Sequence, residues 1–393
     1  MPSTGDKLSI LGFGCMRLPM KGIAIDKPRA IAQIRGAIDR GVNYLDTAWP
    51  YHAGASETLL GEALEDGYRE RVKIADKLSP WLCKSQEDME TLLNAQLKKL
   101  KTDQIDYYLI HALDGKGWER IKSFGVVDFL KRAQDDGRIK NIGFSFHGIY
   151  DDFQLIVDDN EWSFCQIQYN ILDENSQAGR KGLNYAAAAG LGVIIMEPLR
   201  GGGLTEKLPG QVADVYDRSP TKRSNAEWAL RWLWDHPEIQ VVLSGMNEES
   251  HIDENIKIAS EAEPCSLTED ERAILDEASE VYRKVCKVPC TGCQYCMPCP
   301  FDVNIPRVFD FYNQYYFGGS KFITNATYIN HLGGILTPDP HLASQCTGCK
   351  KCVKKCPQLI DIPAEMKNAK KVLERPIRTF FIKWLMRLFM FRK

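Results

Sequence analysis

Two cysteine tracts in the last third of this chain restrict its fold more than any other feature. The first is Cys290-x2-Cys293-x2-Cys296-x2-Cys299-Pro300, and the second is Cys346-x2-Cys349-x2-Cys352-x3-Cys356-Pro357. Four thiolates at this spacing, followed by proline, are typical of iron–sulfur ligands. Zinc sites use separated Cys-x2-Cys pairs instead, and disulfide frameworks belong to small secreted domains. The tracts therefore predict a local fold built around iron.

The second tract resembles the cluster motif of bacterial two-cluster ferredoxins at every cysteine, whereas the first has one residue fewer before its last cysteine. The chain also repeats itself after each tract, because Cys299–Pro306 parallels Cys356–Pro363. The resemblance implies two 4Fe-4S clusters with crossed ligation. One would be bound by Cys290, Cys293, Cys296 and Cys356, and the other by Cys346, Cys349, Cys352 and Cys299.

Length, net charge and cysteine content indicate what kind of protein this is. With 393 residues, the chain is long enough for one large and one small domain. A formal net charge of −2 gives no electrostatic reason to expect nucleic-acid binding. The thirteen cysteines and the lack of a recognisable secretion signal predict a reducing, cytoplasmic location. No apolar run approaches the length of a transmembrane helix.

Up to about residue 262, short β-like runs alternate with amphipathic helical stretches. The expected strands are Leu11–Met16, Asn43–Asp46, Val72–Ala75, Ile105–Ile110, Ile139–Phe144, Phe164–Gln168, Gly192–Met196 and Ile239–Leu243. Eight alternations in about 250 residues predict a (β/α)8 barrel. A doubly wound sheet is the alternative, but no Gly-x-Gly-x-x-Gly follows an early strand.

The remaining domain boundaries follow from composition. We expect the barrel over residues 1–265, a linker helix over 266–285 that begins at the Ser266–Glu271 capping signal, and a ferredoxin-like α+β domain over 286–366 with an aromatic insert at 307–345. Residues 367–393 form a basic amphipathic helix in this prediction. That helix would lie on a membrane surface or dock on protein, and we favour protein.

Chemistry in a barrel belongs at the C-terminal strand ends. Asp46 and Tyr51 follow the second strand, Lys77 the third and His111 the fourth. Here the sequence resembles the aldo-keto reductases, through Leu11–Met16, Leu45–Tyr51, Ser56-Glu57, Ile74–Lys77 and Tyr107–His111. Singly, these residues could be a helix cap, rim packing, a surface charge and an internal hydrogen bond. Their joint occurrence at the expected strand ends favours catalysis.

The resemblance implies reduction of a carbonyl to an alcohol. Tyr51 would be the general acid, and Lys77 would lower the pKa of its phenol. Asp46 would hold Lys77, and His111 would donate a hydrogen bond to the substrate oxygen.

The resemblance also implies NADP(H) or NAD(H) as the cofactor. Ser145 and Gln166 stand where the family holds the nicotinamide amide, although the residue after Ser145 departs from the family pattern. Met196 replaces a stacking tyrosine, and His251 stands where members that prefer NADPH often have arginine. The full expected set is Ser145, Gln166, Met196, Pro198, Leu199, Arg200, Gly202, Ser244, Gly245, Met246, His251, Glu254 and Asn255.

The best hypothesis is a carbonyl reductase with a small carbonyl substrate and iron–sulfur clusters. The alternative is an electron-transfer protein that couples a ferredoxin-like or membrane redox partner to a reaction in the barrel. Because hydride carries two electrons and a cluster carries one, that alternative needs a splitter such as flavin, for which the sequence has no distinctive motif. A binding module without catalysis is a third reading, against which the tetrad argues.

Overall fold

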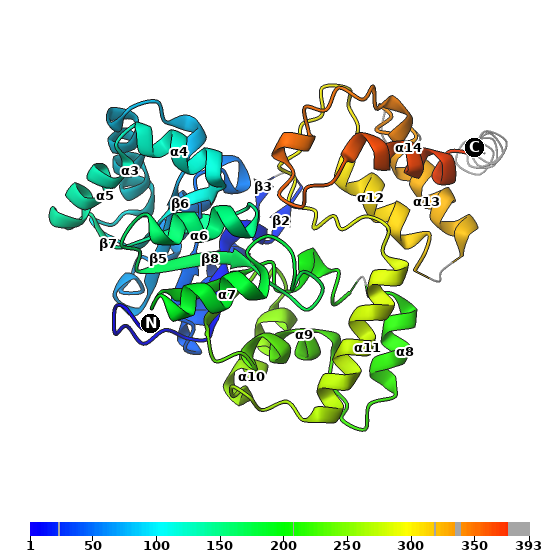
Figure 1. Cartoon of the computed structure of the whole chain (residues 1–393), viewed down its shortest axis with the longest axis horizontal. Coiled ribbons are helices and arrows are strands. Elements are labelled where there is room, and N and C mark those ends of the chain that lie inside the picture. The colour runs from blue at the N-terminus through cyan, green and yellow to red at the C-terminus, as the bar shows by residue number, and fades with distance from the viewer. Residues whose placement is uncertain (23, 207, 318–319, 335–338, 376–393) are drawn as a thin grey trace. The chain divides into compact units, whose positions relative to one another are not determined.

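A computed structural model describes residues 1–375, apart from residues 23, 207, 318–319 and 335–338. The chain divides into two compact units (Figure 1). The barrel unit comprises Met1–Leu199 and Ala226–Leu267. The cysteine unit comprises Arg200–Asn225 and the described residues from Thr268 onward. Sequence analysis had assigned residues 200–225 to the barrel, and the structure groups them with the cysteine tracts.

The barrel unit contains eight parallel strands that close on themselves. In sequence they are β1 (Leu11–Gly14), β4 (Tyr44–Asp46), β5 (Lys73–Leu78), β6 (Ile105–Leu113), β7 (Ile139–Phe146), β8 (Phe164–Gln168), β9 (Gly192–Met196) and β10 (Ile239–Ser244). Each pairs with the next, and β10 closes the barrel by pairing with β1, with Leu11 opposite Val242. The predicted (β/α)8 barrel is therefore confirmed.

Side chains fill the interior of the barrel. Tyr44, Tyr107 and Phe164 are fully buried, and successive rings meet edge to face at 5.4 and 5.1 Å between centroids. Space between strands is so limited that a Cβ added at Gly143 would lie 2.6 Å from the Phe164 carbonyl oxygen. The interior is a packed core, so chemistry is confined to the ends of the strands.

Helices surround the strands, and their apolar faces pack inward. They are α1 (Lys27–Asp39), α2 (Ser56–Ala63), α3 (Gln86–Leu100), α4 (Gly115–Ser123), α5 (Val126–Asp135), α6 (Tyr150–Asp158), α7 (Gly179–Ala188), α9 (Asn225–Trp234) and α10 (Glu249–Glu261). Helix α3 shows how sequence sets the bounds: the Ser85 hydroxyl accepts a hydrogen bond from the Asp88 N–H at its start, and Lys101 turns left-handed after its end. A short antiparallel pair, β2 (Met20–Lys21) and β3 (Ala24–Ile25), follows β1.

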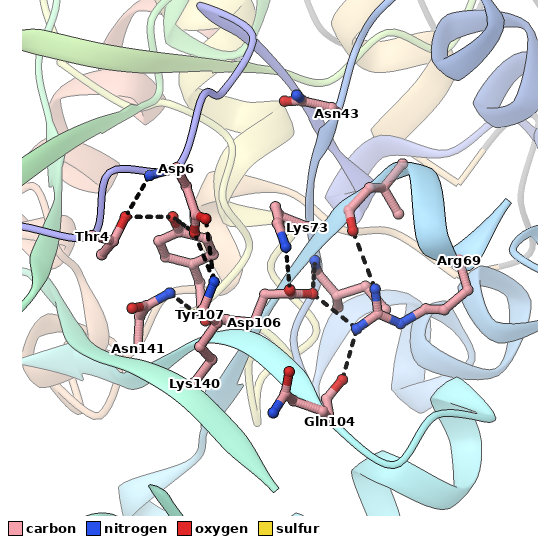
Figure 2. Close-up of polar contacts among 12 residues, drawn as sticks. Thr4, Asp6, Asn43, Arg69, Lys73, Gln104, Asp106, Tyr107, Lys140 and Asn141 are labelled. Atoms are coloured by element: carbon pink, nitrogen blue, oxygen red, sulfur yellow. Dashed lines mark hydrogen bonds and ion pairs between the residues drawn. The ribbon is translucent and has the colours of Figure 1, made fainter. Parts of the chain in front are cut away.

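A polar network occupies the N-terminal ends of the strands (Figure 2). The buried carboxylate of Asp106 accepts hydrogen bonds from Arg69 at 2.8 Å, Lys73 at 3.1 Å and the Ile74 N–H at 3.1 Å. Beside it, the Tyr107 hydroxyl donates to Asp6 at 2.8 Å. These groups satisfy one another at the N-terminal ends of the strands, opposite the end where barrel enzymes hold their active sites.

The cysteine unit is helical in its described part. It contains α8 (Gly210–Asp217), α11 (Glu269–Val285), α12 (Ile305–Gln314), α13 (Lys321–Leu332) and α14 (Ile362–Leu373). Helix α8 packs along α11, which begins with a capping box of Thr268 and Glu271 (Figure 1). This start agrees with the predicted linker helix.

Aromatic side chains of the insert form the core of this unit. Phe309, Phe311, Tyr312 and Tyr315 are buried in one cluster with residues that include Tyr328 and Met366. The described residues of the unit contain no strand, which differs from the α+β expectation. The reason is local: a capped helix with an early proline starts a few residues after each tract, so no extended run is left to pair.

The predicted C-terminal helix falls mostly outside the described residues. Helix α14 covers Ile362–Leu373, and residues 376–393 are not described. Within the described part of the chain, the structure has no helix long and apolar enough to cross a membrane.

Candidate active site and cysteine clusters

The four residues of the expected tetrad meet at one mouth of the barrel. The Lys77 ammonium donates to both carboxylate oxygens of Asp46 at 2.7 Å and to the Thr47 carbonyl oxygen at 2.8 Å. It also lies 3.3 Å from the Tyr51 hydroxyl. The His111 ring stands edge-on to the Tyr51 ring, with 6.1 Å between centroids. Strands β4, β5 and β6 and the turn that starts at Tyr51 thus bring an acid, a base and two hydrogen-bonding rings together.

Burial governs the electrostatics of this cluster. Lys77 is 1% exposed and Asp46 is 3% exposed. Burial raises the pKa of Asp46, and the Lys77 charge opposes that rise. The pKa of Tyr51 is raised well above its usual value by burial and by the negative charge of Asp46. The sequence predicted a phenol pKa lowered by Lys77, whereas in this structure the pKa is raised, with desolvation of the phenolate as the largest cause.

His111 is neutral at physiological pH. Burial lowers the pKa of its imidazole well below the usual value, and the Lys77 charge adds to the effect. Its ring also lies 5.1 Å from the indole of Trp81, which is 48% exposed. Sequence analysis did not select Trp81, although its place directly after β5 in Ser79-Pro80-Trp81 was a usable signal. It supplies an apolar surface next to His111.

Buried polar side chains of α2 and α3 form a hydrogen-bond network that reaches the backbone of Lys77. Gln96 of α3 donates to the Lys77 carbonyl oxygen at 3.0 Å and to Glu57 of α2 at 3.1 Å. Glu57 also accepts from Lys99 at 2.7 Å. Burial and the neighbouring Glu57 raise the pKa of Asp76 well above its usual value. The sequence showed Glu57 only as part of a motif, because its partners lie on separate elements.

Ser145 and Gln166 lie side by side at the mouth, paired in register across β7 and β8. Both are buried. The Ser145 hydroxyl accepts from the Ala112 N–H at 2.7 Å. The buried Gln166 side-chain oxygen has no hydrogen-bond partner among the described residues. A buried acceptor without a donor fits the N–H of a carboxamide, so these residues fit a nicotinamide.

The residues expected at the adenosine end lie at and beyond the end of β10. The buried Asn255 of α10 donates to the Ser244 hydroxyl at 3.0 Å. Met246 is buried, whereas His251 and Glu254 are half-buried on α10 and Gly245 is exposed. Met196 ends β9 and is half-buried. The structure therefore brings Ser244 and Asn255 together, and it leaves the imidazole of His251 partly open to solvent.

Four residues of the expected cofactor set that are consecutive or nearly so in sequence are divided between the two units. Pro198 and Leu199 belong to the barrel unit, and Arg200 and Gly202 belong to the cysteine unit. Arg200 is buried there, with its guanidinium carbon 5.9 Å from the ring centroid of Tyr282. Its positive charge acts on Cys290, whose pKa it lowers against the larger effect of burial.

The eight tract cysteines fall into two electrostatic groups. Burial raises the pKa of Cys290 and of Cys296 to about 12, and both thiols also respond to the charges of Cys293 and Cys356. Burial likewise raises the pKa of Cys352, which responds to Cys346, Cys349 and Cys299. In each group, the fourth cysteine therefore comes from the other tract.

The second group surrounds a cavity. It is lined by Cys299, Cys346, Cys349 and Cys352 together with Val303, Ile305, Ile362, Met366 and other residues. None of the thirteen cysteines, all of which the structure describes, forms a disulfide. No three His, Cys, Asp or Glu side chains of the described residues are placed to hold one metal ion. What makes this site suitable for a 4Fe-4S cluster is that four cysteines, the usual ligand set of such a cluster, line one apolar cavity.

The two tracts repeat each other in backbone conformation. Positive φ angles occur at the corresponding positions Gly292 and Gly348, at Gln294 and Lys350, and again at Asp302 and Leu359. After each tract the side chain of Asn304 or Asp361 caps the next helix. The internal repeat seen in the sequence is therefore a repeat of structure. The shorter loop of the first tract contains a cis peptide bond between Met297 and Pro298.

Comparison with known proteins agrees with both units. Residues 10–280 match the sequence model of the Aldo/keto reductase family, and residues 289–362 match that of a 4Fe-4S dicluster domain. Among curated relatives, the uncharacterized oxidoreductase C215.11c of Schizosaccharomyces pombe is 27% identical over 283 residues, covering 68% of this chain and 85% of the relative. L-galactose dehydrogenase of Arabidopsis thaliana is 26% identical over 300 residues, covering 68% and 89%.

Solved structures show the same fold. The holo form of aldo-keto reductase AKR11C1 from Bacillus halodurans superposes with a TM-score of 0.58 at 24% identity, over 69% of this chain and 92% of that one. An aldo-keto reductase from Klebsiella pneumoniae in complex with NADPH gives 0.57 at 21% identity, over 69% and 90%. This chain is an oxidoreductase that belongs to the aldo/keto reductase family and carries a C-terminal 4Fe-4S dicluster domain.

Proposed function

We propose that the barrel reduces a small aldehyde or ketone with NADP(H), and that the cysteine unit holds two 4Fe-4S clusters. The observation that carries the catalytic part is the placement of one buried ammonium. Lys77 contacts Asp46 at 2.7 Å and the Tyr51 hydroxyl at 3.3 Å in the same mouth as His111. The bound nicotinamide supplies the hydride.

Tyr51 is the proton donor in this proposal. Its raised pKa keeps the phenol protonated at neutral pH, so a proton is available when negative charge develops on the substrate oxygen. Lys77 then stabilises the phenolate that remains, and Asp46 fixes the position of the ammonium. The neutral His111 donates a hydrogen bond to the same oxygen. Trp81 bounds the substrate on its apolar side.

Ser145 and Gln166 orient the cofactor by holding its carboxamide. The unsatisfied acceptor of Gln166 supports this assignment, and Met196 contributes soft apolar packing at the end of β9. We choose NADP(H) over NAD(H) because the similar Klebsiella pneumoniae enzyme was solved with NADPH.

The proposed ligand sets of the cysteine unit follow the two thiol groups. One set is Cys290, Cys293, Cys296 and Cys356, and the other is Cys346, Cys349, Cys352 and Cys299. The mutual influence of these thiols supports the crossed arrangement. When bound, such clusters carry electrons one at a time.

The test of the catalytic proposal is Tyr51→Phe in the full chain, assayed anaerobically for oxidation of NADPH with a panel of aldehydes and ketones. We expect kcat to fall by about 10²–10⁴-fold, as for loss of a general acid, with NADPH binding retained. Tyr68→Phe is the matched control, since it removes a hydroxyl that donates to the exposed Asp39 at 3.1 Å. Undiminished carbonyl reduction by the Tyr51 variant would remove Tyr51 from its role.

A further inference from the structure

Seven exposed lysines gather on the second cysteine tract and on the helix that follows it. We call this surface the lysine face, and it consists of Lys350, Lys351, Lys354, Lys355, Lys367, Lys370 and Lys371. Residues 346–373 contain these seven lysines and only two carboxylates, which gives a formal charge of +5 in a chain whose total is −2. The positive charge is therefore concentrated in one place.

The lysine face is not neutralised from within. No carboxylate of the described residues forms an ion pair with any of the seven. The two local acids have other tasks, since Asp361 caps α14 through the Ala364 N–H and Glu365 accepts from Asn368. A group of unpaired like charges is a source of long-range attraction for an acidic partner.

The charge marks one tract and not the other. From Cys290 to Pro300 the chain has no charged residue, whereas four lysines lie between Cys349 and Cys356. Charge needed for folding alone would be expected in both tracts, because positive φ angles recur at corresponding positions of the two. The difference between them points to a task specific to the second.

One of these lysines lines the same cavity as the most accessible cysteine of the two tracts. Cys349 is exposed, and the cavity that it lines with Cys299 is also lined by Lys350 and Phe301. Phe301 is 40% exposed. An exposed aromatic ring and an exposed cysteine in a segment rich in exposed lysines suit a small and short-lived contact, as in electron-transfer complexes.

We propose that the lysine face docks an acidic one-electron carrier protein beside the cavity of Cys299, Cys346, Cys349 and Cys352. The inference rests on the proposed function in one respect, which is that these thiols hold a cluster. A cluster held by these thiols would accept one electron from the reduced carrier, with no bond made or broken and no proton transferred. A membrane with anionic lipid would also attract lysines, but it does not require an exposed redox ligand at their centre.

The experiment uses the full chain with its clusters and a labelled plant-type 2Fe-2S ferredoxin, an acidic one-electron carrier, as the probe. Binding is followed by fluorescence anisotropy at low salt and at about 0.3 M salt, where charges are largely screened. One variant reverses the tract (K350E/K351E/K354E/K355E) and a second reverses α14 (K367E/K370E/K371E). The control K98E/K116E/K131E/K257E changes four exposed lysines in the barrel unit, as many as the tract variant and one more than the α14 variant.

We expect the wild-type chain to bind the ferredoxin at low salt and to lose affinity steeply as salt rises. Each lysine-face variant should weaken binding at low salt by about tenfold or more, and the control by less than about twofold. Mixing with reduced ferredoxin should bleach the cluster absorbance faster in the wild type than in either variant. Because α14 lies outside the ligand tract, its variant remains informative if the tract variant loses its cluster.

Three outcomes overturn the proposal. The first is a wild-type chain that does not bind, or that binds without exchanging an electron. The second is a pair of lysine-face variants that bind like the control. The third is loss of binding to phosphatidylserine vesicles in these variants with unchanged ferredoxin affinity, which would assign the surface to lipid. Iron content and the EPR signal after chemical reduction, measured in every variant, separate failure of docking from failure of the cluster assignment.

Discussion

Replacing Lys77 with methionine would leave the Asp46 carboxylate buried without its cation. In the native site both of its oxygens accept from Lys77 at 2.7 Å, and Asp46 is 3% exposed. Breaking such a buried pair by removal of one partner costs about 3–5 kcal/mol. The chain can avoid the buried charge by protonating Asp46 in the folded state, and this makes the cost depend on pH.

The loss of stability can be calculated from the difference in proton binding between the folded and unfolded states. If Asp46 is protonated in the folded state and ionised in the unfolded state, the free energy of unfolding falls by about 1.4 kcal/mol for each pH unit above about 3.9, the ordinary aspartate pKa. The free energy of unfolding of Lys77→Met should therefore be lower than that of the wild type by up to about 4 kcal/mol at pH 7 and by about 1.5 kcal/mol at pH 5. Burial raises the pKa of Asp46 even in the wild type, so these figures are upper limits. The sign is that of a raised carboxyl pKa: stability is lost as pH rises.

The assay is urea unfolding followed by tryptophan fluorescence at the two pH values. Seven of the eight tryptophans belong to the barrel unit, so the signal reports on the barrel. The double variant Asp46→Asn with Lys77→Met is the control, because a neutral amide removes the charge that must be buried. It should recover most of the stability and lose the pH dependence, yet remain inactive. A loss for Lys77→Met that is equal at pH 5 and pH 7 would refute the reasoning, since it would indicate lost packing rather than a buried charge.

Three further predictions concern other parts of the chain. Asp106→Asn should lower the free energy of unfolding by about 1–3 kcal/mol, because a buried acceptor of three hydrogen bonds loses its charge. Carbonyl reduction should stay unchanged. Urea unfolding measures the first effect and steady-state kinetics the second. Gln166→Leu should raise the Kd for NADPH by about tenfold, measured by quenching of protein fluorescence, with the iron content unaltered. Under crossed ligation, C290A/C356A removes two ligands of one cluster and should keep about four iron atoms per chain. C346A/C356A removes one ligand from each cluster and should keep close to none, whereas Cys286→Ser should keep all the iron. Equal iron content in the two double variants would contradict crossed ligation.

Much of the architecture can be predicted from local sequence patterns. Eight short apolar runs separated by amphipathic stretches predict a barrel, because strands covered on both faces need continuous apolar sequence. Asp46, Lys77 and His111 could be named from the sequence because strand ends converge in any such barrel, whatever its details. The cysteine tracts are equally local, since their spacing is fixed by the geometry of the metal group that they bind.

Properties that depend on contacts between distant segments could not be obtained in this way. The layer of Gln96, Glu57 and Asp76 behind Lys77 joins α2, α3 and β5, and no spacing in the sequence relates them. The grouping of residues 200–225 with the cysteine unit arises from the packing of α8 on α11. The lysines of the second tract were visible in the sequence. Only the structure shows that they are exposed, that no described carboxylate pairs with them, and that Lys350 lines a cavity with Cys349.

The pKa of Tyr51 shows the difference between what the sequence determines and what the tertiary structure determines. The sequence supplies a phenol and an ammonium, and the charge of the ammonium alone predicts a lowered pKa. The tertiary structure buries both and adds the carboxylate of Asp46, and the pKa is raised instead. Sequence determines which charges are present, and the fold determines how much water is removed from them. At Tyr51, desolvation is the largest cause of the shift in pKa.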